Sequence, residues 1–157
     1  MRRFVTRDDL AATAEELRHR GVRVVFTNGC FDLLHPGHIR LISKAAAMGD
    51  RVMIAINDDA SVRRLKGDDR PIYPVVERAE ILLALRWVDY VTAFPEDTPL
   101  QTIRMVRPDV LVKGGEYRER DIVGATFVRS YGGRVARVTM KKGFSTRLIV
   151  RRVSETG

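Results

Sequence analysis

The sequence predicts an α/β fold, a three-layer sandwich around a five-stranded parallel sheet. Short apolar runs alternate with helical patterns along most of the 157 residues. This order is typical of a parallel sheet that helices cover on both faces. Hydrophobic residues make up 45% of the chain, which is enough to build a core at this length. No repeat, low-complexity segment or linker interrupts the pattern, so we expect one domain over residues 1–157.

Five short apolar runs are predicted as strands. They lie at residues 22–27, 51–56, 88–93, 109–113 and 134–140. Six segments are predicted as helices from their periodicity and their end signals. They lie at residues 6–20, 35–48, 76–86, 100–106, 121–131 and 145–153. The first helix begins with capping-box spacing between Thr6 and Asp9. The second ends at Gly49, the fourth stops before Pro108, and the fifth ends at Gly132-Gly133.

The composition excludes several classes of protein. Cys30 is the single cysteine, so the chain has no internal disulfide framework and no multi-cysteine zinc site. A lone cysteine is compatible with a reducing compartment, and we expect a cytoplasmic protein. The longest apolar run, residues 81–85, is far shorter than the roughly 20 residues that span a bilayer. The first ten residues lack the apolar segment of a signal peptide. We therefore expect no membrane association.

The positive charge lies mainly in the last quarter of the chain. The net charge is +8, and residues 117–157 carry 10 basic and 3 acidic groups, which accounts for +7 of it. Such a segment attracts anions, whether nucleic acid, phosphorylated metabolites or anionic lipid. A module for single-stranded nucleic acid would interleave exposed aromatic residues with the arginines. Phe127, Tyr131 and Phe144 are too few for that, so we expect no nucleic-acid partner.

The loops that follow the predicted strands hold the unusual residues. Ligands of parallel sheets bind beyond the carboxyl ends of the strands, here in the loops at residues 27–38, 57–75, 113–118 and 141–146. Neither a dinucleotide fingerprint nor a P-loop motif is present. In the first loop, Pro36 suits the first turn of a helix, and His35 and His38 are three residues apart on one side of it. A helix N-terminus binds phosphate, and two imidazoles there can donate hydrogen bonds to it. The alternatives are histidines that cap the helix or a metal pair, and a metal pair is disfavoured because no third histidine is near in the sequence and Cys30 is the one thiol.

Residues 29–38 resemble the HxGH signature of the nucleotidyltransferase superfamily, which includes the cytidylyltransferases and has a Rossmann-like fold. The KMSKS element of class I aminoacyl-tRNA synthetases, which share the signature, is absent. Further blocks are similar to the adenylyltransferase domain of ADP-heptose synthases, and the similarity covers about residues 3–153. These blocks lie at residues 57–62, 64–67, 69–72, 108–115 and 145–146. No sugar-kinase half accompanies them, as in a stand-alone transferase.

This resemblance implies an enzyme that converts ATP and D-glycero-D-manno-heptose 1-phosphate to ADP-heptose and pyrophosphate. The sugar phosphate would attack the α-phosphorus in line, without a covalent enzyme intermediate, and positioning and charge stabilisation would supply the catalysis. The implied cofactor is Mg²⁺, held mainly by the triphosphate and not by a protein metal site. Relatives also suggest a homodimer.

The resemblance assigns roles to individual residues. The implied catalytic residues are His35, His38 and Lys66. The implied nucleotide-binding residues are Asn28, Gly29, Cys30, Phe31, His35, Gly37, His38, Lys113, Gly114, Gly115, Ser145 and Thr146. The implied acceptor-site residues are Asp32, Asp59 and Arg78.

Three features of the sequence leave alternatives open. Residues 86–89, Arg-Trp-Val-Asp, are similar to an element of glycerol-3-phosphate cytidylyltransferases, so the alternative is a cytidylyltransferase that acts on glycerol 3-phosphate or another polyol phosphate. Arg147 stands where the family often has a second threonine, and it either contacts a phosphate or points to solvent. Cys30 is expected to be a buried small residue. A catalytically silent nucleotide sensor is a further alternative, although both histidines and Lys66 are present.

Overall fold

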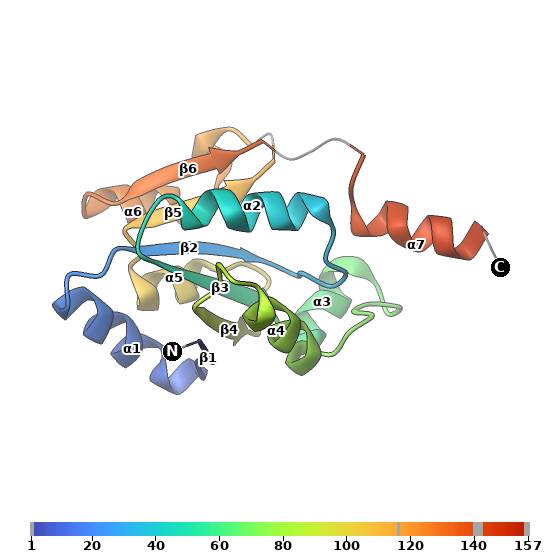
Figure 1. The fold of residues 1–157 in the computed structure, drawn as a ribbon, viewed down its shortest axis with the longest axis horizontal. Coiled ribbons are helices and arrows are strands. Elements are labelled where there is room, and N and C mark those ends of the chain that lie inside the picture. The colour runs from blue at the N-terminus through green and yellow to red at the C-terminus, as the bar shows by residue number, and fades with distance from the viewer. Residues whose placement is uncertain (1, 116, 140–142, 156–157) are drawn as a thin grey trace.

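The computed structural model describes residues 2–115, 117–139 and 143–155, and these residues form one parallel sheet covered by helices (Figure 1). The strands are β1 (Arg3–Phe4), β2 (Val24–Gly29), β3 (Arg51–Asn57), β4 (Tyr90–Phe94), β5 (Val110–Gly114) and β6 (Arg134–Val138). The helices are α1 (Arg7–His19), α2 (Pro36–Ala46), α3 (Asp59–Lys66), α4 (Val75–Ala84), α5 (Leu100–Val106), α6 (Ala125–Ser130) and α7 (Thr146–Glu155), with a 3₁₀ turn η1 at Glu119–Asp121. Among these residues, no helix is both long and apolar enough to cross a membrane.

The prediction of a three-layer α/β sandwich is confirmed, but the sheet has six strands instead of five. The additional strand, β1, has two residues and pairs with β4 at the sheet edge. A strand this short has no periodicity from which the sequence could reveal it. The predicted strand at residues 134–140 ends at Val138, and Met140 lies outside the described residues.

Two predicted segments also differ in the structure. Residues 59–66, expected to be part of a loop, form α3, whose N-terminus is capped by the Asp58 carboxylate accepting from the Ser61 N–H at 2.7 Å. Only Ser61 and Val62 of this helix are buried, so its apolar stripe is too narrow for the sequence pattern to show it. The helix predicted at residues 121–131 is reduced to α6, because Gly124 adopts a left-handed φ of 86° just before it.

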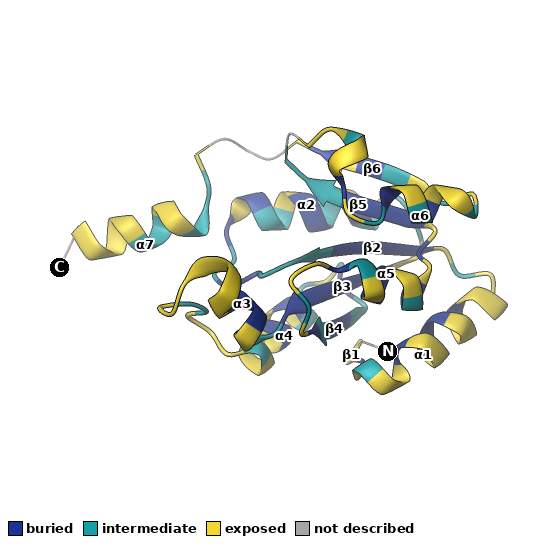
Figure 2. Cartoon of the chain, turned by 180° about the vertical axis from the view of Figure 1, so that it is seen from behind, coloured by how far each residue is buried: buried dark blue, intermediate teal, exposed yellow. Residues whose placement is uncertain are grey.

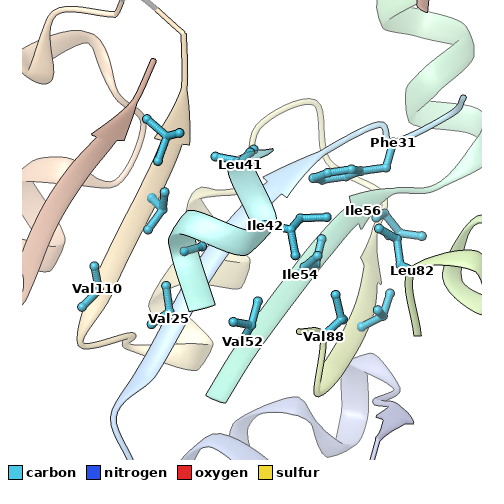
Figure 3. Packing of buried hydrophobic residues seen from close by; sticks show 14 of the residues in the cluster. Val25, Phe31, Leu41, Ile42, Val52, Ile54, Ile56, Leu82, Val88 and Val110 are labelled. Atoms are coloured by element: carbon cyan, nitrogen blue, oxygen red, sulfur yellow. The ribbon is translucent and has the colours of Figure 1, made fainter. Parts of the chain in front are cut away.

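The sheet separates two hydrophobic cores, and alternate residues of each strand point into one or the other. Helices α2 and α4 cover one face, where Val25, Val52 and Ile54 pack against Ile42 and other helix residues (Figure 3). Helices α1, α5 and α6 cover the opposite face, over the side chains of strand residues such as Phe26 and Met53. The central strands are buried along most of their length, whereas α7 has no buried residue and extends away from the sheet (Figure 2).

The strand order determines where a ligand can bind. The order is β1-β4-β3-β2-β5-β6, so the chain proceeds from β2 to β3 and β4 on one side and later to β5 and β6 on the other. Where the strand order changes direction, the loops that follow the two central strands run to opposite sides of the sheet. A crevice opens between these loops, beyond the carboxyl ends of the strands. The crevice here lies beyond β2 and β5, where the loop after β2 contains the histidine motif.

Three aspartates hold the opposite, amino edge of the sheet. Asp50, Asp89 and Asp109 accept hydrogen bonds from the backbone N–H groups of Arg23, Val52 and Val24 at 2.8, 2.9 and 2.7 Å. Each of these N–H groups lies at the start of a strand, where the hydrogen-bond ladder of the sheet leaves it unpaired. The carboxylate supplies the missing acceptor. These contacts fix the alignment of β2 and β3 at a distance from the proposed ligand crevice.

Replacement of Asp109 should therefore affect stability and not ligand binding. Asp109→Ala removes the acceptor of the Val24 N–H, and an unsatisfied donor of this kind costs about 1–3 kcal/mol. Urea unfolding should show this loss, while Asp109→Asn, which keeps a carbonyl acceptor, should lose less. Equal stability of Asp109→Ala and the parent protein would contradict the role assigned to the carboxylate.

Candidate active site

A cavity of about 570 Å³ lies beyond the carboxyl ends of the central strands. Three segments that are distant in the sequence line it, within residues 30–38, 66–70 and 145–147. The lining residues are Cys30, Phe31, Asp32, His38, Lys66, Arg70, Ser145, Thr146 and Arg147. Seven of them were predicted as site residues, and Arg147 was noted without an assigned role. Arg70 was missed, although it lies within the block at residues 69–72, because nothing in the sequence shows which side chain of that block points toward the cavity.

The loop after β2 contains a strained residue. Phe31 has a φ of 47°, in the left-handed region that residues other than glycine seldom adopt. Such a conformation persists only where the surroundings enforce it. The Phe31 ring is buried in the core beside α2, and its centroid lies 5.0 Å from that of His38. Burial of the ring therefore holds the loop backbone in the turn that leads into α2.

The two histidines at the start of α2 are fixed by backbone hydrogen bonds. Nδ1 of His35 accepts from the Gly37 N–H at 3.1 Å, and Nδ1 of His38 accepts from the His35 N–H at 3.4 Å, so the pair forms a capping box. An Nδ1 that accepts a hydrogen bond is unprotonated, so each neutral ring carries its proton on Nε2. The arrangement leaves the Nε2–H groups as donors for a ligand.

Burial keeps both imidazoles neutral. Desolvation, and to a smaller extent the neighbouring His35, lower the pKa of His38 to about 4. The pKa of His35 is lowered by burial as well. The rings stack with their centroids 3.8 Å apart, which disfavours two positive charges. At neutral pH they are donors without charge, and the N-terminus of α2 supplies the positive potential.

The structure places the two histidines differently. His38 lines the cavity described above, whereas His35 is buried and borders a separate, more open hollow with Leu34 and Ile39. Because His38 lines the cavity, a triphosphate bound there could reach its side chain, as predicted. For His35, the observed contacts are those of a residue that caps α2 and supports the His38 ring.

The N-terminus of α7 forms another side of the cavity. The hydroxyl of Ser145 accepts from the Leu148 N–H at 3.2 Å, as an N-cap does, and Thr146 Oγ1 donates to the Leu33 carbonyl at 3.5 Å. The start of α7 is thereby held against the loop that precedes α2. Two helix N-termini thus meet at one cavity, an arrangement that favours a ligand with several phosphate groups.

Other predicted nucleotide-binding residues lie at the ends of the central strands, outside the cavity lining. Asn28 and Gly29 end β2, Lys113 and Gly114 end β5 with Gly115 directly after it, and Gly37 is in the first turn of α2. Burial lowers the pKa of Lys113, whose Nζ lies 5.7 Å from the centroid of the Tyr117 ring. The contact of these residues with a nucleotide remains a prediction.

Cys30 has the environment of a structural thiol. Its Sγ lies 3.8 Å from Oδ1 of Asn57, to which it donates, and burial raises the pKa of the thiol. A raised thiol pKa disfavours the reactive thiolate at neutral pH. The expectation that Cys30 is buried is met only in part, because the residue is half-buried and lines the cavity.

Two of the predicted acceptor-site residues are paired with each other outside the cavity lining. The Arg78 side chain is 0% exposed, and its Nη2 donates to Oδ1 of Asp59 at 2.7 Å. Its other nitrogens donate to the carbonyls of Cys30, Asn57 and Tyr73 at 2.7, 2.8 and 2.9 Å. Arg78 therefore joins the chain segments around the cavity and does not present its guanidinium to a ligand in this structure.

Comparison with known proteins is consistent with this site. A family model described as Cytidylyltransferase-like matches residues 26–147. The bifunctional protein HldE of Pelobacter propionicus is 52% identical over 149 residues, which are 95% of this chain and 30% of that protein. HldE of Gluconacetobacter diazotrophicus is 48% identical over 154 residues, 98% of this chain and 32% of that protein. The chain thus spans about a third of the length of these relatives.

Two solved structures are also similar. The lipopolysaccharide core biosynthesis protein of Thermoplasma volcanium has a TM-score of 0.65 at 25% identity, covering 78% of this chain and all of that one. The pantoate-beta-alanine ligase of Francisella tularensis has a TM-score of 0.67 at 15% identity, covering 90% of this chain and 68% of that one, which shows the Rossmann-like fold alone. The family model includes both histidines and extends over most of the chain, so this chain belongs to the cytidylyltransferase-like family.

Proposed function

We propose that residues 1–157 act as one adenylyltransferase domain, which transfers AMP from ATP to D-glycero-D-manno-heptose 1-phosphate and releases pyrophosphate. The observation that carries the proposal is the meeting of two helix N-termini and the His38 Nε2–H donor at one cavity that Lys66 also lines. This set of donors suits a triphosphate whose charge shifts during transfer. The similarity to HldE proteins and to a lipopolysaccharide core biosynthesis protein supports a sugar-phosphate acceptor.

The proposed mechanism needs positioning and charge stabilisation and no nucleophilic side chain. A phosphate oxygen of the acceptor is ionised at neutral pH and attacks the α-phosphorus in line, and the bond to the bridging oxygen of pyrophosphate breaks. His38 donates from Nε2 to the phosphate oxygens as negative charge accumulates on them. Ser145, Thr146 and the N-terminus of α7 bind the β- and γ-phosphates, and Lys66 neutralises part of their charge.

The donor set of the cavity fits a divalent ion that arrives with the nucleotide. Within the described ranges, no group of three or more His, Cys, Asp or Glu side chains could hold a metal ion, and Asp32 is the one carboxylate among the cavity-lining residues. Mg²⁺ is commonly bound through substrate phosphates with few protein ligands. We infer that Mg²⁺ is the ion, held by the triphosphate, and that it supplies charge neutralisation at the leaving group.

Three further features belong to the proposal. The donor is ATP and not CTP, because the blocks at residues 57–72 and 108–115 resemble adenylyltransferases. The active form is a homodimer, for which the exposed apolar groove lined by Phe4, Val76 and Leu83 offers a surface. The use of ATP places the reaction in the cytoplasm.

The assay that tests the proposal measures pyrophosphate release in the presence of Mg²⁺. ATP or CTP is paired with heptose 1-phosphate or glycerol 3-phosphate, in all four combinations. Of the four combinations, we expect only ATP with heptose 1-phosphate to release pyrophosphate. Release from CTP, or with glycerol 3-phosphate, would retain the mechanism and reassign the substrates, and no release from any pair would refute the proposed transfer.

His38→Ala should lower kcat by about 10²- to 10³-fold, the usual effect of removing one preorganised donor to the transition state. The fold should persist, because His38 is at the cavity surface and not in either core. His19→Ala provides the matched control, since His19 is an exposed residue of α1. Activity of His38→Ala within a few-fold of the parent would remove His38 from the mechanism.

The low pKa of His38 predicts how stability depends on pH. Folding favours the neutral ring, because the pKa falls from 6.5 to about 4 in the folded protein. This contribution to stability is complete above pH 6.5 and is lost as the pH falls toward 4, with a slope of up to about 1.4 kcal/mol per pH unit. Urea unfolding of His38→Gln between pH 4 and 7 should show a shallower dependence than that of the parent. Parallel curves for the two proteins would show that His38 is not held neutral.

A further inference from the structure

Arg70 lines the cavity but has no role in the mechanism described so far. Its Nε donates to Oδ2 of Asp32 at 2.6 Å, and its side chain is 18% exposed. A guanidinium carries five N–H donors in a planar fork, and this bond uses one of them. Within the described part of the chain, Asp32 is the ion-pair partner of Arg70, so the terminal nitrogens can bind a second anion. Their geometry suits two oxygens of one phosphate group.

Asp32 is an anchor for Arg70 and not a ligand-binding group. Its side chain is 1% exposed, and its carboxylate also accepts from the backbone N–H groups of Ile72 at 2.8 Å and Tyr73 at 3.0 Å. The loop that carries Arg70 thus occupies both carboxylate oxygens. An unpaired carboxylate at this position would repel a phosphate, and the bond to Arg70 balances that charge.

The loop around Arg70 is fixed from a second direction. Arg78 Nε donates to the Tyr73 carbonyl at 2.9 Å, so residues 70–73 are held by Asp32 on one side and by Arg78 on the other. A side chain held in this way has less freedom to lose when it binds a ligand. Arg70 is therefore preorganised at the cavity before any substrate arrives.

The position of Arg70 in the topology is compatible with a role toward the acceptor. The proposed triphosphate site lies at the N-termini of α2 and α7, and the nucleoside is expected beside the end of β5. Arg70 belongs to the connection between α3 and α4, which follows β3 on the other side of β2. The acceptor must bring one anion toward another, so a cation on its approach lowers their repulsion.

We propose that Arg70, positioned by Asp32, binds the phosphate group of the acceptor, a sugar 1-phosphate, and holds it for attack on the α-phosphorus. This inference rests on the proposed function and deepens it. It places Arg70 in the acceptor site, for which the resemblance implied Arg78. Arg70 is thus a substrate-binding residue, and Asp32 is a positioning residue.

Arg70→Gln tests the assignment through the separate KM values of the two substrates. We expect the KM for heptose 1-phosphate to rise about 10- to 100-fold, the range for a lost hydrogen bond to a charged group. The KM for ATP should change by less than about twofold. Arg70→Lys should recover part of the acceptor affinity, because it restores the charge without the fork. An equal rise for both substrates, or no rise for either, would overturn the proposal.

Arg64→Gln is the matched control. Arg64 also pairs with an aspartate, Asp97, at 2.9 Å, but both side chains are half exposed and neither lines the cavity. Both KM values of this variant should equal those of the parent. A rise in the acceptor KM of Arg64→Gln as large as that of Arg70→Gln would show that any lost arginine has this effect, and it would overturn the specific role of Arg70.

Asp32→Asn separates positioning from charge. If Asp32 acts by holding Arg70, the KM for the acceptor rises in the single variant Asp32→Asn. The double variant Asp32→Asn/Arg70→Gln should then have an acceptor KM close to that of Arg70→Gln alone. If Asp32 acts through its charge alone, loss of a negative charge lowers the acceptor KM. The second outcome would overturn the positioning role.

Binding measurements distinguish failure of this inference from failure of the proposed function. Calorimetric titrations use protein saturated with the α,β-methylene analogue of ATP, which cannot release pyrophosphate, and heptose 1-phosphate or inorganic phosphate as the titrant. Weaker binding of either titrant to Arg70→Gln than to the parent supports the phosphate site, even where the parent shows no turnover. Equal binding of both titrants to the two proteins overturns it, even where the parent is active.

Discussion

The buried guanidinium of Arg78 is the interaction on which the geometry of the cavity depends. It binds the carbonyls of Cys30, Asn57 and Tyr73 and the carboxylate of Asp59, so it joins the end of β2, the end of β3, the start of α3 and the loop before α4. A charge without solvent exposure is costly unless its donors are paired, and here three carbonyls and a carboxylate pair them. The arrangement leaves the loop at residues 70–73 little freedom, and the cavity is shaped before a ligand enters.

The positive potential of the cavity comes from the N-terminal dipoles of two helices and from lysine and arginine side chains. The imidazoles do not contribute charge, because both are neutral. The neutral histidines cap α2 through Nδ1, so their orientation is determined by the helix to which they belong. Lys66 and Arg147 are exposed side chains at the cavity, whereas Arg70 is held by a buried carboxylate. One anchored cation, two exposed cations and two helix N-termini together suit a reaction in which charge moves from one phosphorus substituent to another.

The charge distribution of the sequence indicated the class of ligand but not the residues that bind it. Most of the excess charge lies in residues 117–157, yet of the described residues of that segment Arg147 is the one cation that lines the cavity, beside Lys66 and Arg70 from the earlier part of the chain. Arg134 and Arg137 are instead the exposed residues of β6, the strand at the sheet edge. Net charge reports the attraction of anions, while the direction of each side chain depends on the element that carries it.

The α/β sandwich, the family and the histidine motif could be predicted from the sequence, because periodicity, end signals and a local motif are properties of neighbouring residues. The sequence does not reveal β1 or α3, since two edge residues carry no period and α3 buries too few side chains. The tertiary structure was needed to show that Arg78 is a buried connector, that His35 is buried beside His38, and that Arg70 faces the cavity. Most hydrogen bonds of the two arginines reach partners 19 to 48 residues away in the chain, and no local pattern encodes which of several arginines such partners will enclose.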